Sequence, residues 1–339
     1  MSLARYVARR LLLQVFVLLG VSALTFFLMF VMPGDPATLL AEYTGAFDAA
    51  AIKEFKARWG FDRPLPQQYL TYMRNLLHGD FGIALATRRP ILDDMMSFFL
   101  ATVELSAVAF LMALVMGVIG GIASAVQRNR PLDHLVRLGS LFGVSMPIFW
   151  LAIILLLVFY YHLGWVPSSR RIAMTMAVPP HRTGLYTVDT LLAGDLYGFF
   201  SVLRHLVLPA FVLAFSIVGL VARVMRASTL EVLGQDYVRT AHAKGLRRSA
   251  VLFRHVVRNA LIPTVTVLGL AVGGLLSGAV LTETVFAWPG LGRFIVQSIF
   301  SLDRAAVVGA TLLTATVYSI VNLAVDVLVA LLDPRIRYD

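Results

Sequence analysis

The chain has 339 residues, of which 59% are hydrophobic and 14% charged, and it contains no cysteine. Soluble domains usually have about 25% charged residues, so an ordinary soluble protein is excluded, as are disulfides, thiolate metal sites and cysteine nucleophiles. The net charge of +10 is explained by the excess of Lys and Arg in the cytoplasmic loops of membrane proteins, and no nucleic-acid partner is expected.

Six uncharged apolar blocks of 17 to 24 residues follow one another along the chain. They are Leu11–Met32, Leu105–Val126, Leu138–Tyr161, Leu206–Ala222, Ala260–Thr282 and Ala305–Val325. About 20 helical residues cross the hydrocarbon core of a bilayer, and His205 and Arg223 extend the short fourth block by snorkelling. The pattern therefore predicts an all-α integral membrane protein with six transmembrane helices.

The connecting segments set the orientation. With the N-terminus inside, the inner segments hold 16 Lys and Arg residues, and the two shorter outer segments hold six. Positive residues prefer the cytoplasmic side, so both termini are predicted to be cytoplasmic. The chain is thus divided into the following segments: 1–32 with helix one, 33–97 outside, 98–162 with helices two and three, 163–204 outside, 205–222 as helix four, 223–259 inside, 260–282 as helix five, 283–304 outside, and 305–339 with helix six and the tail.

Two outer segments are long enough to fold. In 33–97, a helix-like stretch at Ala49–Trp59 precedes the turn Asp62–Pro66 and a second helix at Gln67–Leu77. Segment 163–204 is rich in Pro, Gly, Ser and Thr, which predicts a loop with little regular structure.

Polar residues in or next to the apolar blocks have two interpretations. Glu104 lies at the start of the second helix, Asn322 and Asp326 lie one turn apart in the sixth, and Ser277 follows Gly269 and Gly273 in the fifth. Ionisable groups in lipid face a cavity or a partner, so these residues either line a solute path or form structural pairs. The structural interpretation is favoured for Glu104 and Asp326 because both lie near block ends.

The end of the fifth helix carries a further polar site. Glu283 is expected to cap this helix on the outside and to shape an outer mouth with Trp288, Pro289 and Gly290. The four glycines of the fifth block allow close helix approach. Packing within the chain is the favoured interpretation, and this helix is nonetheless the one expected to face a partner subunit.

The cytoplasmic segment 223–259 carries eight basic residues against two acidic ones. It predicts a helix over Leu233–Lys244, a stop at Gly245 as the C′ residue, and a second helix with Ser249 as N-cap. Leu252, Phe253, Val256, Val257, Ala260 and Leu261 form the apolar stripe of the second helix. The alternative is an interfacial segment lying on anionic lipid.

Signatures of catalysis are missing from the sequence. It has no G-x-x-x-x-G-K-[ST], no H-E-x-x-H and no G-x-S-x-G, and its histidines show no ligand spacing. No enzyme activity, catalytic residue, metal site or directly bound cofactor is therefore expected. A passive channel or a membrane scaffold is compatible with the six helices and the basic loop.

The segment Tyr237–Gly245, followed by Arg258–Pro263, resembles the "EAA" loop of ABC importer permeases in its dipeptide/oligopeptide (peptide/nickel) version. Arg239 stands where the general pattern has Glu, and the proline lies farther from the glycine, as in that subfamily. Other segments resemble the same subfamily: Pro33–Pro36, Gly60–Leu65, Gly79–Gly82, Thr282–Gly292 and Asp333–Arg337. The likeness runs along the whole chain and is closest to the first permease subunit of dipeptide importers.

This resemblance implies a type I ABC importer permease in the bacterial inner membrane. Its cytoplasmic loop would contact an ATPase through Tyr237, Arg239, Ala241, Ala243, Lys244, Gly245, Leu246, Arg247 and Phe253. The implied partners are a homologous second permease, two cytoplasmic ATPases that hold ATP and Mg, a periplasmic peptide-binding protein docking on 33–97 or 163–204, and membrane lipids. Di- or oligopeptides are the implied substrates; nickel chelates, glutathione and haem are the alternatives.

Overall fold

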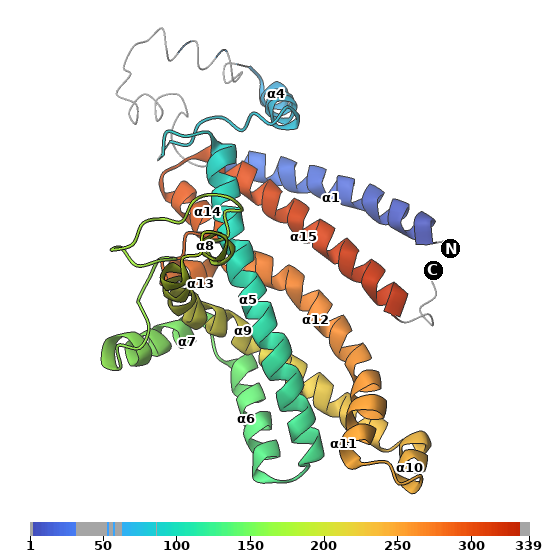
Figure 1. Cartoon of the computed structure of the whole chain (residues 1–339). Helices are drawn as coiled ribbons and strands as arrows, with labels where there is room; N and C mark the ends of the chain where they lie inside the picture. Colours follow the sequence, from blue (N-terminus) through green and yellow to red (C-terminus); the bar gives the residue numbers. More distant parts are fainter. Residues whose placement is uncertain (1–2, 32–52, 54–56, 58–62, 86, 333–339) are drawn as a thin grey trace.

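The computed structural model describes residues 3–31, 53, 57, 63–85 and 87–332 (Figure 1). Its elements are helical: α1 (Leu3–Val31), α4 (Leu65–Leu77), α5 (Ile91–Val126), α6 (Pro131–Ser145), α7 (Ile148–Leu155), η1 (Leu156–His162), α8 (Tyr186–Leu192), α9 (Leu196–Leu233), α10 (Asp236–Ala243), α11 (Arg248–Val251), η2 (Leu252–Val257), α12 (Arg258–Gly278), α13 (Val280–Val285), α14 (Leu291–Phe300) and α15 (Arg304–Leu332). The motifs Pro33–Pro36 and Asp333–Arg337 and most of the helix expected at Ala49–Trp59 lie outside the described residues.

Five stretches are long and apolar enough to cross a membrane: Val7–Leu28, Ile91–Val126, Leu196–Leu233, Arg248–Leu275 and Arg304–Val327. The bent pair formed by α6 and α7–η1 makes a sixth candidate span. The all-helical membrane fold expected from hydropathy is therefore confirmed, with five or six candidate spans.

The third apolar block is broken rather than straight. The chain bends by 112° between α6 and α7–η1. Met146 is extended, with φ −81° and ψ 132°, because a residue before proline avoids the helical region and Pro147 has no N–H to continue the helix. The expectation of one continuous helix over Leu138–Tyr161 was wrong at this point.

Two helices extend well beyond their apolar blocks. α5 begins at Ile91, and α9 runs from Leu196 through Pro209 to Leu233. The expected boundary at residue 98 therefore lies inside α5, and those at 205 and 222 lie inside α9. Hydropathy detects only the part of a helix that crosses lipid. The Asp195 carboxylate accepts a hydrogen bond from the Gly198 N–H (2.8 Å) and caps α9.

The outer segment 163–204 is more ordered than its composition indicated. It contains α8 and the beginning of α9. Asp189 holds its central turn by accepting hydrogen bonds from the Thr183 N–H (2.7 Å) and the Gly184 N–H (2.9 Å). Burial penalises the charged Asp189, but hydrogen bonds from Thr183 and Gly184 outweigh this effect and lower its pKa.

The central core lies between α5 and α9, which pack along most of their length (Figure 1). Small residues make this contact: Ala101, Ala109 and Ala113 from α5, and Ala210 and Ala214 from α9. A Cβ added at Gly117 would lie 2.6 Å from Val221 Cγ1. The helices approach this closely because side chains are small at the crossing.

α6 crosses α9 with backbone against backbone. A Cβ added at Gly219 would lie 2.7 Å from the Ser140 carbonyl oxygen, and one at Gly143 would lie 2.8 Å from the Phe215 carbonyl oxygen. Only glycine fits at both positions.

A buried carboxylate fixes the cytoplasmic end of this crossing. Asp133 of α6 is fully buried and accepts two hydrogen bonds from Arg226 of α9, at 2.7 and 2.9 Å. It also accepts from the Ser124 hydroxyl (2.6 Å) and the Asn129 N–H (2.9 Å). One side chain thus connects α5, the turn before α6, and α9.

Candidate functional site

The cytoplasmic elbow, residues 236–257, comprises α10, the turn at Gly245, α11 and η2. Gly245 has φ +75°, and its N–H donates to the His242 carbonyl (2.9 Å), while the Leu246 N–H donates to the Ala241 carbonyl (3.4 Å). These two bonds make a Schellman motif, which requires a left-handed residue at C′. The expected helix stop at Gly245 is confirmed.

The second arm of the elbow departs from the expected pattern. α11 begins at Arg248, and no side chain caps it, so Ser249 is not the N-cap. η2 is a π-helix that widens the next turn and changes which side chains share a face. Val256 and Ala260 of the expected apolar stripe are buried, but Phe253 is 65% exposed.

A small apolar core holds the elbow together. Val238 and Ala241 of α10 pack with Val251 and Val256 of the second arm, supported by Val232 at the end of α9. The Asn259 side-chain amide donates to the Tyr237 hydroxyl (3.0 Å) and joins α10 to α12. The elbow is therefore a preformed unit attached to the ends of α9 and α12.

Most of the sequence-predicted coupling residues lie on the free surface of this unit. Three of them are apolar or aromatic and well exposed: Tyr237 (44%), Leu246 (44%) and Phe253 (65%). The others on the surface are Arg239, Ala243, Lys244, Gly245 and Arg247. Ala241 differs because it is buried, and its role is to close the elbow core.

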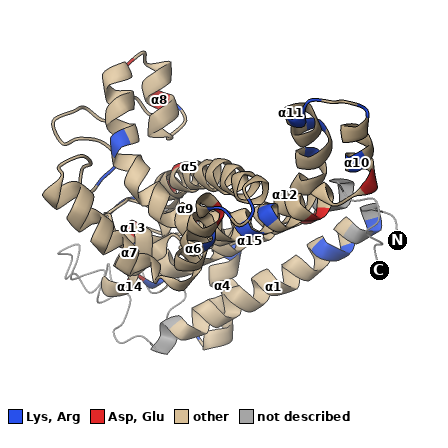
Figure 2. Cartoon of the chain, turned by 90° about the horizontal axis from the view of Figure 1, so that it is seen from below, with Lys and Arg blue, Asp and Glu red and all other residues tan. Residues whose placement is uncertain are grey.

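The exposed face is strongly basic. Figure 2 shows Lys and Arg gathered on α10 and α11. Its one described ion pair, Arg239 Nη1 to Asp236 Oδ1 at 3.7 Å, joins two exposed side chains and contributes little to stability. Apolar side chains surrounded by positive charge suit either an acidic protein surface or anionic lipid.

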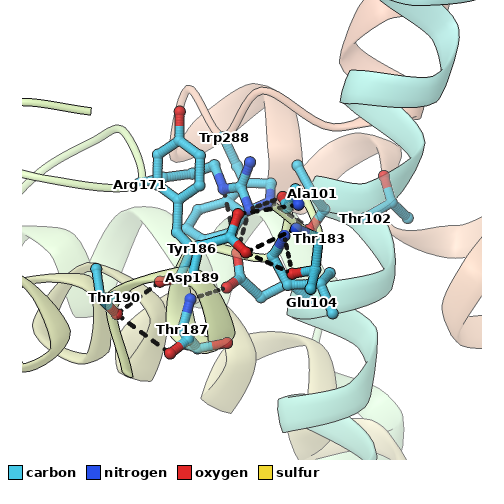
Figure 3. Close-up of polar contacts among 12 residues, drawn as sticks. Ala101, Thr102, Glu104, Arg171, Thr183, Tyr186, Thr187, Asp189, Thr190 and Trp288 are labelled. Carbon is cyan, nitrogen blue, oxygen red and sulfur yellow. Dashed lines mark hydrogen bonds and ion pairs between the residues drawn. The ribbon is translucent and has the colours of Figure 1, made fainter. Parts of the chain in front are cut away.

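Glu104 lies inside α5, well after its start, and its side chain is 2% exposed. Its Oε2 accepts from Arg171 Nη2 (2.5 Å) and Nε (3.1 Å), and its Oε1 accepts from the Thr187 N–H (2.7 Å). The Arg171 guanidinium lies 3.7 Å from the centroid of the Tyr186 ring (Figure 3). Glu104 thus fastens the outer segment to α5.

Glu283 serves a second outer junction. It is fully buried in α13 and accepts from the Thr102 hydroxyl (2.6 Å) and from the Arg293 N–H (2.9 Å). Since Arg293 lies in the first turn of α14, Glu283 caps α14, and the expectation that it caps the fifth helix was wrong. A Cβ at Gly290 would overlap the Glu283 carboxyl group.

Trp288 joins these two junctions. It is fully buried, and its Nε1 donates to the Ala101 carbonyl (2.9 Å). Its ring centroid lies 5.9 Å from the Arg171 guanidinium carbon. Glu104, Glu283 and Trp288 therefore belong to one packed outer cluster, which fastens α5, α8, α13 and α14 together. Figure 3 shows Glu104 and Trp288 on either side of the Arg171 side chain.

The polar residues of the sixth apolar block lie apart from that cluster. Asp326 pairs with Arg10 of α1 (3.1 Å), a helix-to-helix pair of the structural kind. Asn322 lies against Gly273, where an added Cβ would be 2.9 Å from the Asn322 Oδ1. Ser277 lies in α12. The structure therefore does not bring Asn322 and Asp326 into one site with Glu104 and Glu283.

From the sequence, Arg171 and Arg226 contributed only to the Lys and Arg count that set the orientation, and Asp133 was not proposed as a site residue. Arg171 and Glu104 are separated by 67 positions, and Arg226 and Asp133 by 93. No local spacing relates such residues, and only the packing of α5, α6 and α9 shows that they pair. Among the described residues, no group of three or more His, Asp or Glu side chains could hold a metal ion.

Two family descriptions match the chain. "Binding-protein-dependent transport system inner membrane component" matches residues 117–338, and the N-terminal part of such membrane components matches residues 3–106.

Three relatives cover nearly the whole chain. The probable D,D-dipeptide transport system permease protein DdpB of Escherichia coli K12 is 47% identical, over 95% of this chain and 94% of the relative. The di/tripeptide transport system permease protein DppB of Pseudomonas aeruginosa is 44% identical over 98% of both chains. The oligopeptide transport system permease protein AppB of Bacillus subtilis is 34% identical, over 99% of this chain and 100% of the relative.

A solved amino acid ABC transporter is a more distant comparison, with 14% identity and a TM-score of 0.47 over 72% of this chain and 94% of that one.

The family matches and the full-length relatives agree with the apolar spans described above. The chain therefore belongs to the inner membrane components of binding-protein-dependent transport systems, and it is a multi-pass transport protein of the inner membrane.

Proposed function

We propose that this chain is a permease subunit that imports di- or oligopeptides, dipeptides foremost, driven by ATP hydrolysis on partner subunits. The names of its full-length relatives support the substrate. The exposed, preformed elbow around Gly245 is the main observation that supports coupling to an ATPase.

The elbow suits the role of a docking lever. Leu246 and Phe253 present apolar surface that the chain itself leaves uncovered, and the basic residues around them would select an acidic groove. Tyr237 and Ala241 connect this surface rigidly to the chain. ATP and Mg would be held by the partner ATPases, and this chain would bind neither.

Movement of the elbow would reach the membrane helices by two routes. α9 leads directly into α10, and η2 leads directly into α12. The Asp133–Arg226 pair extends the first route to α5 and α6. A shift of the elbow would thus reorient four helices together and expose the solute path alternately to each side.

On the outer side, the segments 33–97 and 163–204 would receive a peptide-binding protein. The cluster around Glu104 and Arg171 holds the second of these segments firmly against α5. A docking surface that is already ordered loses less conformational entropy when a partner binds. The homologous second permease would complete the path.

Replacement of Gly245 tests the coupling. Gly245→Val forces a β-branched residue into a left-handed conformation that such residues rarely adopt, although no neighbouring atom lies within 4 Å of the added Cβ. We expect membrane insertion to persist, while copurification of the ATPases and peptide uptake are lost.

Gly194→Val is the matched control. Gly194 also has a positive φ (+71°) and open space around its Cβ, but it lies in the outer segment, so its replacement should leave ATPase binding unchanged. Normal copurification of the ATPases with Gly245→Val would contradict the role of the elbow. Uptake of labelled dipeptides, measured against nickel chelates, glutathione and haem, tests the substrate separately.

A further inference from the structure

A cavity of about 550 Å³ lies between the outer segment and the first turns of α9. Small-molecule sites in proteins commonly measure about 300–1,000 Å³. Its walls come from the end of η1, from residues 164–176, and from α9 between Tyr197 and His205. No residue of the outer cluster or of the elbow lines this cavity.

The lining of the cavity is positively charged. Arg170, Arg204 and His205 all line it, and no described lining residue is Asp or Glu. Because no carboxylate neutralises the two guanidinium groups, the cavity favours an anion.

Both arginines keep donors available. The Arg170 side chain makes no hydrogen bond or ion pair with any described residue. Arg204 gives one N–H to the Trp165 carbonyl (3.0 Å), and a guanidinium has five N–H donors. Such donors bind phosphate oxygens through short, charge-assisted hydrogen bonds.

The position of Arg170 is fixed by its neighbour. Arg171 follows it directly and is held in the buried pair with Glu104. The backbone from which Arg170 projects is therefore anchored, and little order has to be gained when an anion binds.

The surroundings of the cavity indicate its depth relative to the membrane. Exposed aromatic side chains gather there: Tyr160 (46%), Tyr161 (73%), Trp165 (61%), Tyr197 (79%) and Phe200 (62%). Tyr160, Tyr197 and Phe200 also line the cavity. Trp and Tyr are enriched at the level of the lipid headgroups, where one end of each ring is wet and the other apolar.

We infer that this cavity binds the phosphate group of an anionic phospholipid from the outer leaflet. The arginines would hold the phosphate oxygens, and the aromatic wall would lie against the glycerol backbone and the first methylene groups. A bound lipid would fill the space between the outer segment and α9 and support the segment from the membrane side.

Lipid binding to the purified transporter, with its partner subunits present, tests this inference. The delipidated complex is titrated with phosphatidylglycerol, and bound lipid is counted by native mass spectrometry. The double variant Arg170→Gln/Arg204→Gln should bind at least about tenfold more weakly, because two charge-assisted hydrogen-bonding groups are lost. Arg182→Gln/Arg128→Gln removes the same charge from exposed sites outside the cavity and should change the affinity by less than about twofold.

Arg170→Gln alone is a second variant that removes no contact within the described chain, so it remains informative if the double variant fails to insert. Equal affinity of all variants for phosphatidylglycerol would overturn the inference. So would displacement of the lipid by inorganic phosphate or by a dipeptide at millimolar concentration, since the cavity would then be a site for free anions or for peptide carboxylates.

Discussion

The outer cluster and the cytoplasmic elbow stabilise their shapes in opposite ways. In the outer cluster, charged side chains are buried and paired, as Glu104 is with Arg171. In the elbow, small apolar residues such as Ala241 form the core, and the charged side chains remain in solvent. The outer cluster therefore satisfies its own polar groups, whereas the elbow leaves apolar and basic side chains exposed.

The largest effect is expected where the outer cluster loses one charge. Glu104→Ala leaves the Arg171 guanidinium buried without its partner, which should lower the free energy of unfolding by about 3–5 kcal/mol. Thermal unfolding in detergent, followed by fluorescence, measures this loss. Glu231→Ala, at an exposed position of α9, is the control; an equal loss there would contradict the importance of burial.

A steric change in the same cluster should have the next largest effect. Gly290→Ala pushes a methyl group into the Glu283 carboxyl, and overpacking of this kind costs about 1–3 kcal/mol. Earlier proteolytic cleavage near α13 and α14, together with a lower unfolding temperature, would report it. Gly139→Ala, where nothing lies within 4 Å of the added Cβ, should be neutral or stabilising.

Substitutions on the elbow surface should separate binding from stability. Leu246→Ser and Phe253→Ser remove exposed side chains, so unfolding should change by less than about 0.5 kcal/mol, while binding of the ATPases should weaken about tenfold. Pull-down of the ATPases under varied salt measures the binding. Val256→Ser serves as the reverse control, because that side chain is fully buried and its replacement should destabilise the elbow itself. Unchanged ATPase binding by both surface variants would count against the elbow as the docking site.

The smallest effect is expected for Arg239→Gln. Its side chain is 77% exposed and its carboxylate partner 97%, so solvent screens their attraction. The unfolding temperature should shift by no more than about 1 °C. A shift comparable with that of Glu104→Ala would show that the two regions do not differ as described.

The sequence was sufficient for the features that depend on composition and on local backbone chemistry. Apolar blocks identified the membrane helices because lipid demands long uncharged stretches. The stop at Gly245 was predictable because a left-handed residue is needed there and glycine supplies it without strain. The motifs around Gly245 and Gly290 pointed to the family that the comparisons then showed.

The features that were missed depend on tertiary packing. The bend after Met146 could have been predicted, because Pro147 lies within an apolar block and proline interrupts a helix. Neither the pairing of Arg171 with Glu104 nor the exposure of Phe253 had such a signal. The first joins distant positions, and the second results from a π-turn that no periodicity in the sequence reveals. The coupling to an ATPase stays a prediction that copurification with Gly245→Val tests. The substrate path stays a prediction as well.

The contact between α6 and α9 at Gly143 and Gly219 has a mechanical consequence. Where side chains separate two helices, rotamer changes can absorb a small displacement of one before the other moves. Here main-chain atoms of Ser140 and Phe215 leave room only for a hydrogen atom on each glycine, so the crossing has almost no slack. A tilt of the inner end of α9 would therefore carry α6 with it, and the nearest break in this helical pair is the 112° bend before Pro147.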